Sequence, residues 1–196
     1  MAVLFAGMIF ASILVVALHL AGYDAVAAVR DQSLSEGPEA GLLSNLGILL
    51  MGFSAATAGF GAWKASSLPL AFLSVFCCLF TIDDAFLIHE RLGFWEFLAF
   101  ALYGLLAFIV LFLFWKTADF FPWPVLVAFG AFAVSVAIDV VWGDLVIFIL
   151  PPSQTQYFLW RAGFILEDLP KFGGILVLAS FAMGESLLNP AFEKER

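Results

Sequence analysis

The chain has 196 residues, of which 64% are hydrophobic and only 12% are charged, whereas a soluble domain carries roughly 45–50% apolar and about 25% charged residues. Its mean hydropathy of +1.07 therefore predicts an integral membrane protein. The net charge of −8 argues against nucleic acid as a partner, because nucleic-acid binding needs clustered positive charge. The length fits one domain, which we expect to cover 1–196.

Six apolar segments are long enough to cross a bilayer, whose hydrocarbon core of about 30 Å requires about 20 apolar residues per helix. The sequence thus predicts an all-α, polytopic transmembrane helix bundle of about six spans. The first segment lacks a basic N-terminal region, so we interpret it as a retained span and not as a signal peptide. In chain order, the predicted spans are 2–22, 42–63, 68–90, 94–115, 123–145 and 157–187.

Polar residues, prolines and glycines mark the connections between these spans. After the first span, Asp24–Asp31 is predicted as a short interfacial helix, and Lys64–Ser67 is predicted as a tight turn. The apolar stretch Leu145–Leu150 either extends the fifth span or dips back into the interface. In the sixth span, Pro170 removes a backbone hydrogen bond, so we expect a kink near Lys171.

Tryptophans and basic residues indicate where the spans meet water. Five of the six tryptophans fall near predicted span ends, where amphipathic rings collect at the headgroup level. With six spans both termini share one side, and the count of basic residues slightly favours the cytoplasm for that side. The side with the termini holds Lys64, Lys116, Lys194 and Arg196, and the other side holds Arg30, Arg91 and Arg161.

Ionisable residues inside the spans are the strongest functional signal, because each costs at least about 2.5–3.5 kcal/mol at the helix centre. Successive spans alternate in direction, so the acids late in spans three and five and early in span six belong to the same half of the membrane. We therefore predict that they gather in one interhelical pocket. Its members are Asp83, Asp84, His89, Asp139, Glu167 and Asp168.

The composition of this pocket limits its chemistry. Acids in the region outnumber the bases, so either several acids are protonated or a cation neutralises them. Histidine with carboxylates suits zinc, manganese or iron, carboxylates alone suit calcium, and a row of protonated acids suits a proton path. The leading hypothesis is a divalent-cation site that acts by hydrolysis or oxidation on a lipid-like substrate.

Other interpretations remain open. Glu167 and Lys171 stand one helical turn apart with the acid first, the favourable order for a structural ion pair. Asp83 and Asp84 are alternatively solvated near the interface. The small size and the 17% aromatic content also fit an accessory subunit of a respiratory or photosynthetic membrane complex, and a proton or cation transporter is a third candidate. Whether the chain is an enzyme stays open, because the common catalytic motifs are absent.

Two short patterns carry a resemblance. Residues 81–90 read TIDDAFLIHE, residues 166–173 read LEDLPKFG, and Asp139 lies in the span between them. The patterns resemble those of uncharacterised bacterial polytopic membrane proteins, which often show DD-x4-HE followed by ED-x2-K-x2-G. The resemblance covers about the second half of the chain. It implies a polytopic protein of the bacterial inner membrane and carries no established activity.

Overall fold

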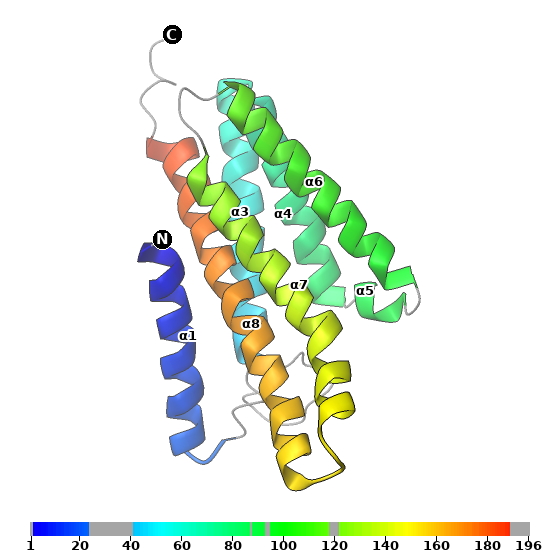
Figure 1. Cartoon of the computed structure of the whole chain (residues 1–196). Coiled ribbons are helices and arrows are strands. Elements are labelled where there is room, and N and C mark those ends of the chain that lie inside the picture. The colour runs from blue at the N-terminus through cyan, green and yellow to red at the C-terminus, as the bar shows by residue number, and fades with distance from the viewer. Residues whose placement is uncertain (1, 24–40, 87, 93–94, 118–121, 189–196) are drawn as a thin grey trace. The chain divides into compact units, whose positions relative to one another are not determined.

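The computed structural model describes residues 2–23, 41–86, 88–92, 95–117 and 122–188, and over these residues every regular element is a helix (Figure 1). The predicted all-α class is therefore confirmed. A short helix, α5 (Ile88–Arg91), and a π-helical turn, η3 (Gly184–Leu188), accompany the long helices. The long helices are α1 (Ala2–Leu20), α3 (Leu42–Ala65), α4 (Leu68–Phe86), α6 (Glu96–Thr117), α7 (Trp123–Ile149) and α8 (Gln154–Met183).

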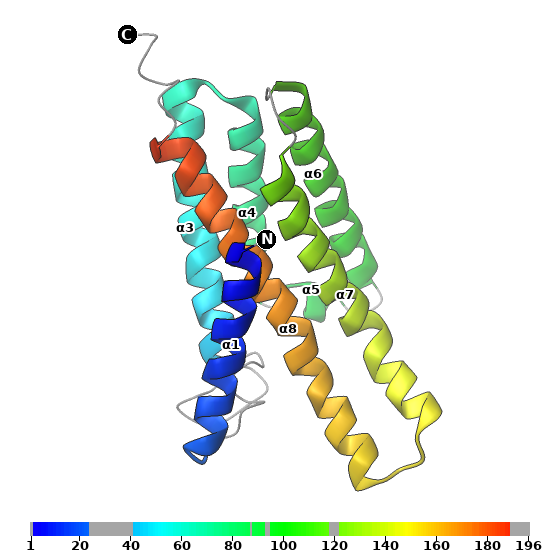
Figure 2. The ribbon, with the colours of Figure 1, turned by 60° about the vertical axis from the view of Figure 1, so that its left-hand side comes forward.

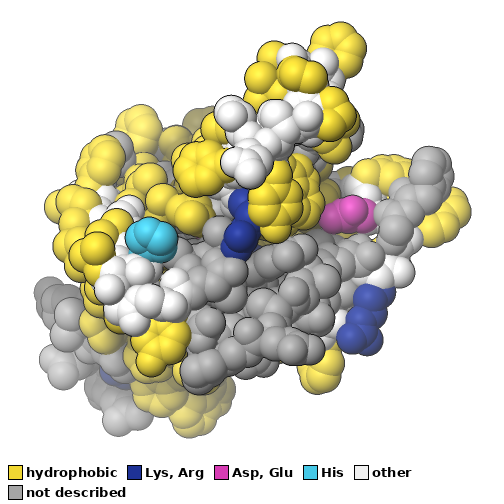
Figure 3. All heavy atoms as spheres, turned by 90° about the horizontal axis from the view of Figure 1, so that it is seen from below, with side chains coloured by type: hydrophobic (Ala, Val, Ile, Leu, Met, Phe, Trp, Pro, Cys, Tyr) yellow, Lys and Arg dark blue, Asp and Glu magenta, His cyan; other side chains and the backbone are white. Residues whose placement is uncertain are grey.

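Five of the long helices, all except α8, are long and apolar enough to cross a membrane. Helix α8 has 30 residues, which is ample length, but its first two-thirds carries the charges of Arg161, Glu167, Asp168 and Lys171. Counted with α8, the chain is a helical bundle of about six spans. Figure 3 views the molecule end-on and shows many hydrophobic side chains among those coloured by type. Along the long helices, large hydrophobic side chains such as Leu49, Phe108 and Val140 are exposed, as a surface in contact with lipid requires.

The chain forms two compact units. Unit 1 comprises Met1–Gly47 and Ala128–Gly174, and unit 2 comprises Ile48–Val127 and Ile175–Arg196. Three helices, α3, α7 and α8, contribute residues to both units. The single domain over 1–196 stays a prediction, and each unit is described separately below.

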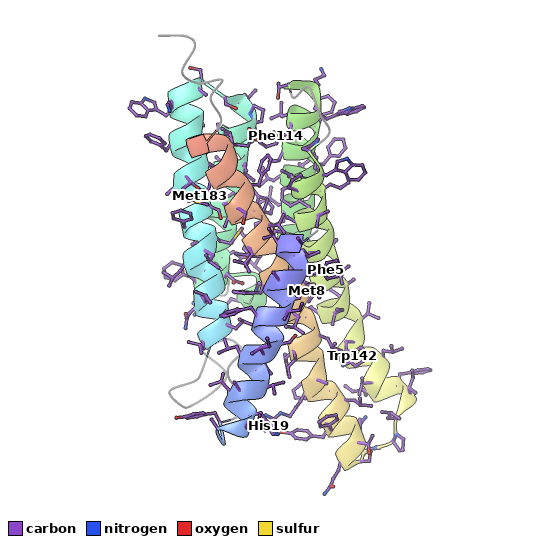
Figure 4. The ribbon with its side chains drawn as sticks, turned by 90° about the vertical axis from the view of Figure 1, so that its left-hand side faces the viewer. Phe5, Met8, His19, Phe114, Trp142 and Met183 are labelled. Carbon is purple, nitrogen blue, oxygen red and sulfur yellow. The ribbon has the colours of Figure 1, made fainter. Side chains whose placement is uncertain are left out.

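In unit 1, two adjacent glycines of α8 allow close contacts with two different helices. A β-carbon on Gly173 would lie 3.0 Å from the Met8 side chain of α1, which crosses α8 in Figures 2 and 4. A β-carbon on Gly174 would lie 2.9 Å from Phe132 and 3.0 Å from the Ala128 carbonyl oxygen of α7. Neighbouring helical positions project about 100° apart, so the pair opens two packing faces on α8.

Helices α7 and α8 form an antiparallel hairpin in unit 1. The Trp142 indole Nε1 donates a hydrogen bond of 2.8 Å to the Leu159 carbonyl oxygen, and Gly163 leaves the space that the same indole fills. Helix α7 continues to Ile149, so the apolar stretch after residue 145 extends the fifth span. The observed helix is four residues longer than the predicted span.

Helix α8 begins three residues before the predicted start of the sixth span because Ser153 caps it. The Gln156 N–H donates to the Ser153 hydroxyl at 3.1 Å, and a serine followed three residues later by glutamine is typical of a helix N-terminus. The helix then continues through Pro170 to Met183. The kink near Lys171 remains a prediction.

In unit 2, α3 and α4 form a second antiparallel hairpin. The Ser74 hydroxyl of α4 donates a 2.8 Å hydrogen bond to the Ala55 carbonyl oxygen of α3, and Gly59 allows this close approach. The predicted tight turn after Lys64 is confirmed: Ser66 has a positive φ of 50°, and the Ser67 N–H donates to the Ala62 carbonyl oxygen at 3.0 Å. Such a left-handed residue is a common helix terminator.

Helix α4 is described to Phe86 and α5 begins at Ile88, with residue 87 outside the described residues, so the predicted end of the third span at residue 90 stays a prediction. Exposed tryptophans flank the helices of unit 2, as predicted. Trp95 lies just before α6 and Trp115 near its end, a separation of about 30 Å by the helical rise, which matches the hydrocarbon thickness. The predicted interfacial helix Asp24–Asp31 lies outside the described residues.

Candidate functional site

The six predicted site residues divide equally between the two units. Unit 2 holds Asp83, Asp84 and His89, whereas unit 1 holds Asp139, Glu167 and Asp168. Among the residues that the structure describes, no three or more His, Cys, Asp or Glu side chains are grouped in a way that could hold a metal ion. The single six-residue pocket stays a prediction.

Asp83 and Asp84 are the most enclosed acids among the described residues. Both belong to the last turn of α4, and only 7% and 5% of their surfaces are exposed. They continue the buried stripe of α4 that includes Leu73 and Phe76, because positions three, four and seven apart share one helical face. Asp83 and Asp84 are therefore buried because they lie on the face of α4 that packs inside unit 2.

Tyr103 of α6 is the third member of this group, which we call the acid-pair site (Asp83, Asp84 and Tyr103). The Tyr103 hydroxyl donates a hydrogen bond to the Asp83 carboxylate, and Asp84 is close enough to act on the same hydroxyl electrostatically. The Tyr103 ring packs against Phe76 at 6.2 Å and against Phe80 at 5.7 Å between centroids.

Sequence reasoning missed Tyr103. One signal was available, because a lone tyrosine among the phenylalanines and leucines of α6 brings a hydroxyl that needs a partner when it is buried. No periodicity, however, shows which helix offers that partner. The pairing of α6 with α4 had to come from the tertiary structure.

Helix α5 brings the predicted ligand His89 into the same region. It follows α4 after one residue and packs against both α4 and α6, the two helices that supply the acid-pair site. The described part of α5 includes the backbone of His89 and the exposed side chain of Arg91, but not the His89 side chain. Only the backbone position of His89 next to the acid-pair site is therefore established.

Unit 1 carries a looser set of polar residues at one level of the α7–α8 hairpin. On α7, Asp139 lies between the two residues that contact glycines of α8, Phe132 and Trp142. The Asp139 side chain is exposed. On α8, the stretch between those glycines, Gly163 and Gly174, carries half-buried Glu167, Asp168 and Lys171. The structural ion pair between Glu167 and Lys171 stays a prediction.

The remaining histidine and the cysteines are not members of the acid-pair site. His19 is exposed in the last turn of α1, in unit 1 (Figure 4). Both cysteines are free thiols, and Cys77 is buried while Cys78 is exposed. Buried Cys77 packs as a small hydrophobic side chain.

The chain belongs to the family described as "Domain of unknown function (DUF8692)", whose model matches residues 1–183. No curated protein and no solved structure matches the chain. That family description states no activity, so function has to be argued from the residues themselves.

Proposed function

We propose that this protein binds a divalent cation inside the membrane, at a site centred on Asp83 and Asp84. The observation that supports the proposal is the burial of two consecutive aspartates in a helix that is apolar enough to span a membrane, with 7% and 5% of their surfaces exposed. Burying an ionised carboxylate is costly unless another charge compensates it. A divalent cation offsets two such charges at once.

The side chains at the acid-pair site indicate which cations fit. The two carboxylates offer oxygen atoms only, and oxygen ligands favour Ca²⁺ or Mn²⁺. A nitrogen ligand from His89 on α5 would shift the preference toward Mn²⁺, iron or Zn²⁺. A His89→Ala variant separates the two alternatives. If oxygen atoms alone bind the cation, its affinity for Ca²⁺ stays unchanged; if His89 is a ligand, its affinity for the cation falls.

Two wider parts of the proposal reach beyond the acid-pair site. The acids of unit 1, Asp139, Glu167 and Asp168, belong to the proposal through the sequence pattern alone, and we expect a lipid-like substrate because the site lies in membrane-spanning helices. The proposed location is a bacterial inner membrane with both termini in the cytoplasm.

Metal analysis of the purified chain tests the proposal. We expect about one equivalent of a divalent cation in the wild type and almost none in Asp84→Asn, because an amide oxygen is a much weaker ligand than a carboxylate. Elemental mass spectrometry after removal of loosely bound metal measures both. Glu185→Gln is the matched control, because Glu185 lies in η3 at the opposite end of unit 2. A wild type without cation would contradict the proposal.

Asp139→Asn, measured in the same way, tests whether both units contribute to one site. Loss of the cation in this variant supports the single pocket. Retention of the cation there, together with its loss in Asp84→Asn, confines the site to unit 2. Thermal unfolding in detergent must stay near the wild-type midpoint for either result to count.

An accessory subunit of a larger membrane complex is the second candidate function, and the exposure of α6 favours it. Only Val110 and Phe114 are buried along its 22 residues, which leaves a long apolar and aromatic face for other helices. This candidate predicts partners that remain bound after extraction in a mild detergent. Native mass spectrometry that finds only the lone chain would count against it.

A further inference from the structure

Two helices end in unit 2 with the same pair of residues, a tryptophan followed by a lysine. Trp63 and Lys64 come just before the last residue of α3. Trp115 and Lys116 hold the same positions in α6. Helix α4 is antiparallel to α3, and α6 returns along α4, so both pairs lie at one end of unit 2, the upper end in Figures 1 and 2. We propose that these four residues, the tryptophan–lysine ends, bind the headgroups of acidic phospholipids.

The tryptophan–lysine ends carry hydrogen-bond donors and positive charge that the described protein does not use. The surfaces of Trp63 and Trp115 are 80% and 64% exposed, and both lysine side chains are exposed. Among the described residues, no carboxylate pairs with either lysine and no acceptor takes either indole N–H. Indole and ammonium groups only donate, so their complement is an anionic group that only accepts. A phospholipid phosphate has that chemistry.

The depth of these donors favours a lipid over a soluble acidic protein. Trp115 lies about 30 Å along α6 from Trp95, one hydrocarbon thickness, which places it at the headgroup level. The Lys116 Nζ lies 5.0 Å from the centroid of the Phe112 ring, one helical turn back along the membrane span. The ammonium group is therefore directed toward the bilayer, where headgroup phosphates reach it.

The test uses the full-length protein, freed of lipid in detergent, and two probes, acidic phosphatidylglycerol and neutral phosphatidylcholine. Native mass spectrometry during titration measures the dissociation constant for each lipid. We expect the wild type to prefer phosphatidylglycerol. Lys64→Gln and Lys116→Gln should each lower that preference about fivefold, the usual contribution of one lysine near an anionic lipid surface. The inference does not depend on the cation-binding function proposed above.

Matched variants separate the local contacts from net charge. Arg91→Gln removes the same charge from an exposed residue at the opposite end of unit 2 and should keep the wild-type preference. Lys64→Arg and Lys116→Arg retain the charge and should also keep it. Phenylalanine in place of both Trp63 and Trp115 removes two donors, so it should weaken the binding of both lipids equally, because both carry a phosphate.

Three outcomes would overturn the proposal. The first is a wild type without preference for phosphatidylglycerol, or a double variant, Lys64→Gln with Lys116→Gln, that keeps the preference; an acidic protein would then be the better complement. The second is an equal loss in Arg91→Gln, because net charge alone would explain it. The third is displacement of phosphatidylglycerol by an equal concentration of glycerol phosphate, because a soluble phosphate would then suffice as the ligand.

Discussion

The two units treat their acids in opposite ways. Unit 2 encloses Asp83 and Asp84 almost completely and supplies a hydroxyl from a neighbouring helix. Unit 1 leaves Asp139 exposed on α7 and the charged residues of α8 half-buried, while it packs its helices closely through glycines. Acidic residues of the membrane helices thus have different surroundings in the two units, and the difference comes from which helix packs against them.

Chemical accessibility should show the largest difference between the units. A hydrophobic carbodiimide modifies the carboxyl groups that it can reach from the lipid, so we expect more modification of exposed Asp139 than of buried Asp83 and Asp84. Peptide mass spectrometry after labelling in liposomes measures each site. Asp139→Asn identifies the labelled peptide. Comparable labelling of Asp84 and Asp139 would contradict the difference between the units, because it would mean that the reagent reaches the acid pair from the lipid.

The close packing of unit 1 should be the next most sensitive feature. In Gly174→Ala, the added methyl would meet the Ala128 carbonyl oxygen at 3.0 Å and Phe132 at 2.9 Å. Such overpacking costs about 1–3 kcal/mol in the free energy of unfolding. Denaturation in mixed micelles, followed by circular dichroism, measures the change.

Gly130→Ala is the matched control for that variant. Gly130 lies on α7 in the same unit, and a β-carbon there has nothing within 4 Å. Replacing a helical glycine by alanine in open space stabilises a soluble protein by roughly 0.5–1 kcal/mol, so this variant should be as stable as the wild type or more so. Equal destabilisation by both changes would show that α8 does not depend on its close approach to α7.

The smallest effect concerns a buried hydroxyl of unit 2. Ser186 is fully buried in η3, and its Oγ has no hydrogen-bond partner among the described residues. Ser186→Ala removes an unsatisfied group, so the free energy of unfolding should stay unchanged or rise by about 1 kcal/mol.

Ser54→Ala sharpens this prediction, because Ser54 is equally buried but donates to the Leu50 carbonyl oxygen at 2.7 Å. Its loss should lower stability by about 0.5–1.5 kcal/mol. A larger cost at Ser186 than at Ser54 would indicate a hydrogen bond to Ser186 that the described residues do not contain.

Local signals were sufficient for the membrane helices and their turns. The Ser66 turn and the ends of α1, α3 and α6 fall within two residues of the positions predicted from composition. The start of α8 differed because the Ser153–Gln156 cap outweighed hydropathy. The end of the fifth span differed because hydropathy sets no sharp limit in an unbroken apolar stretch.

By itself, the sequence determined the class of this protein, its helices and the acids that lipid disfavours. Each membrane helix satisfies its own backbone hydrogen bonds, so its existence depends on one stretch of sequence alone. The tertiary structure alone decided that Asp83 and Asp84 are buried, that Asp139 is exposed, and that Tyr103 donates to Asp83. The burial of a side chain and its hydrogen-bond partners depend on which helices face one another. In weakly amphipathic spans such as α3 and α6, the sequence pattern hardly indicates which face packs against a neighbour.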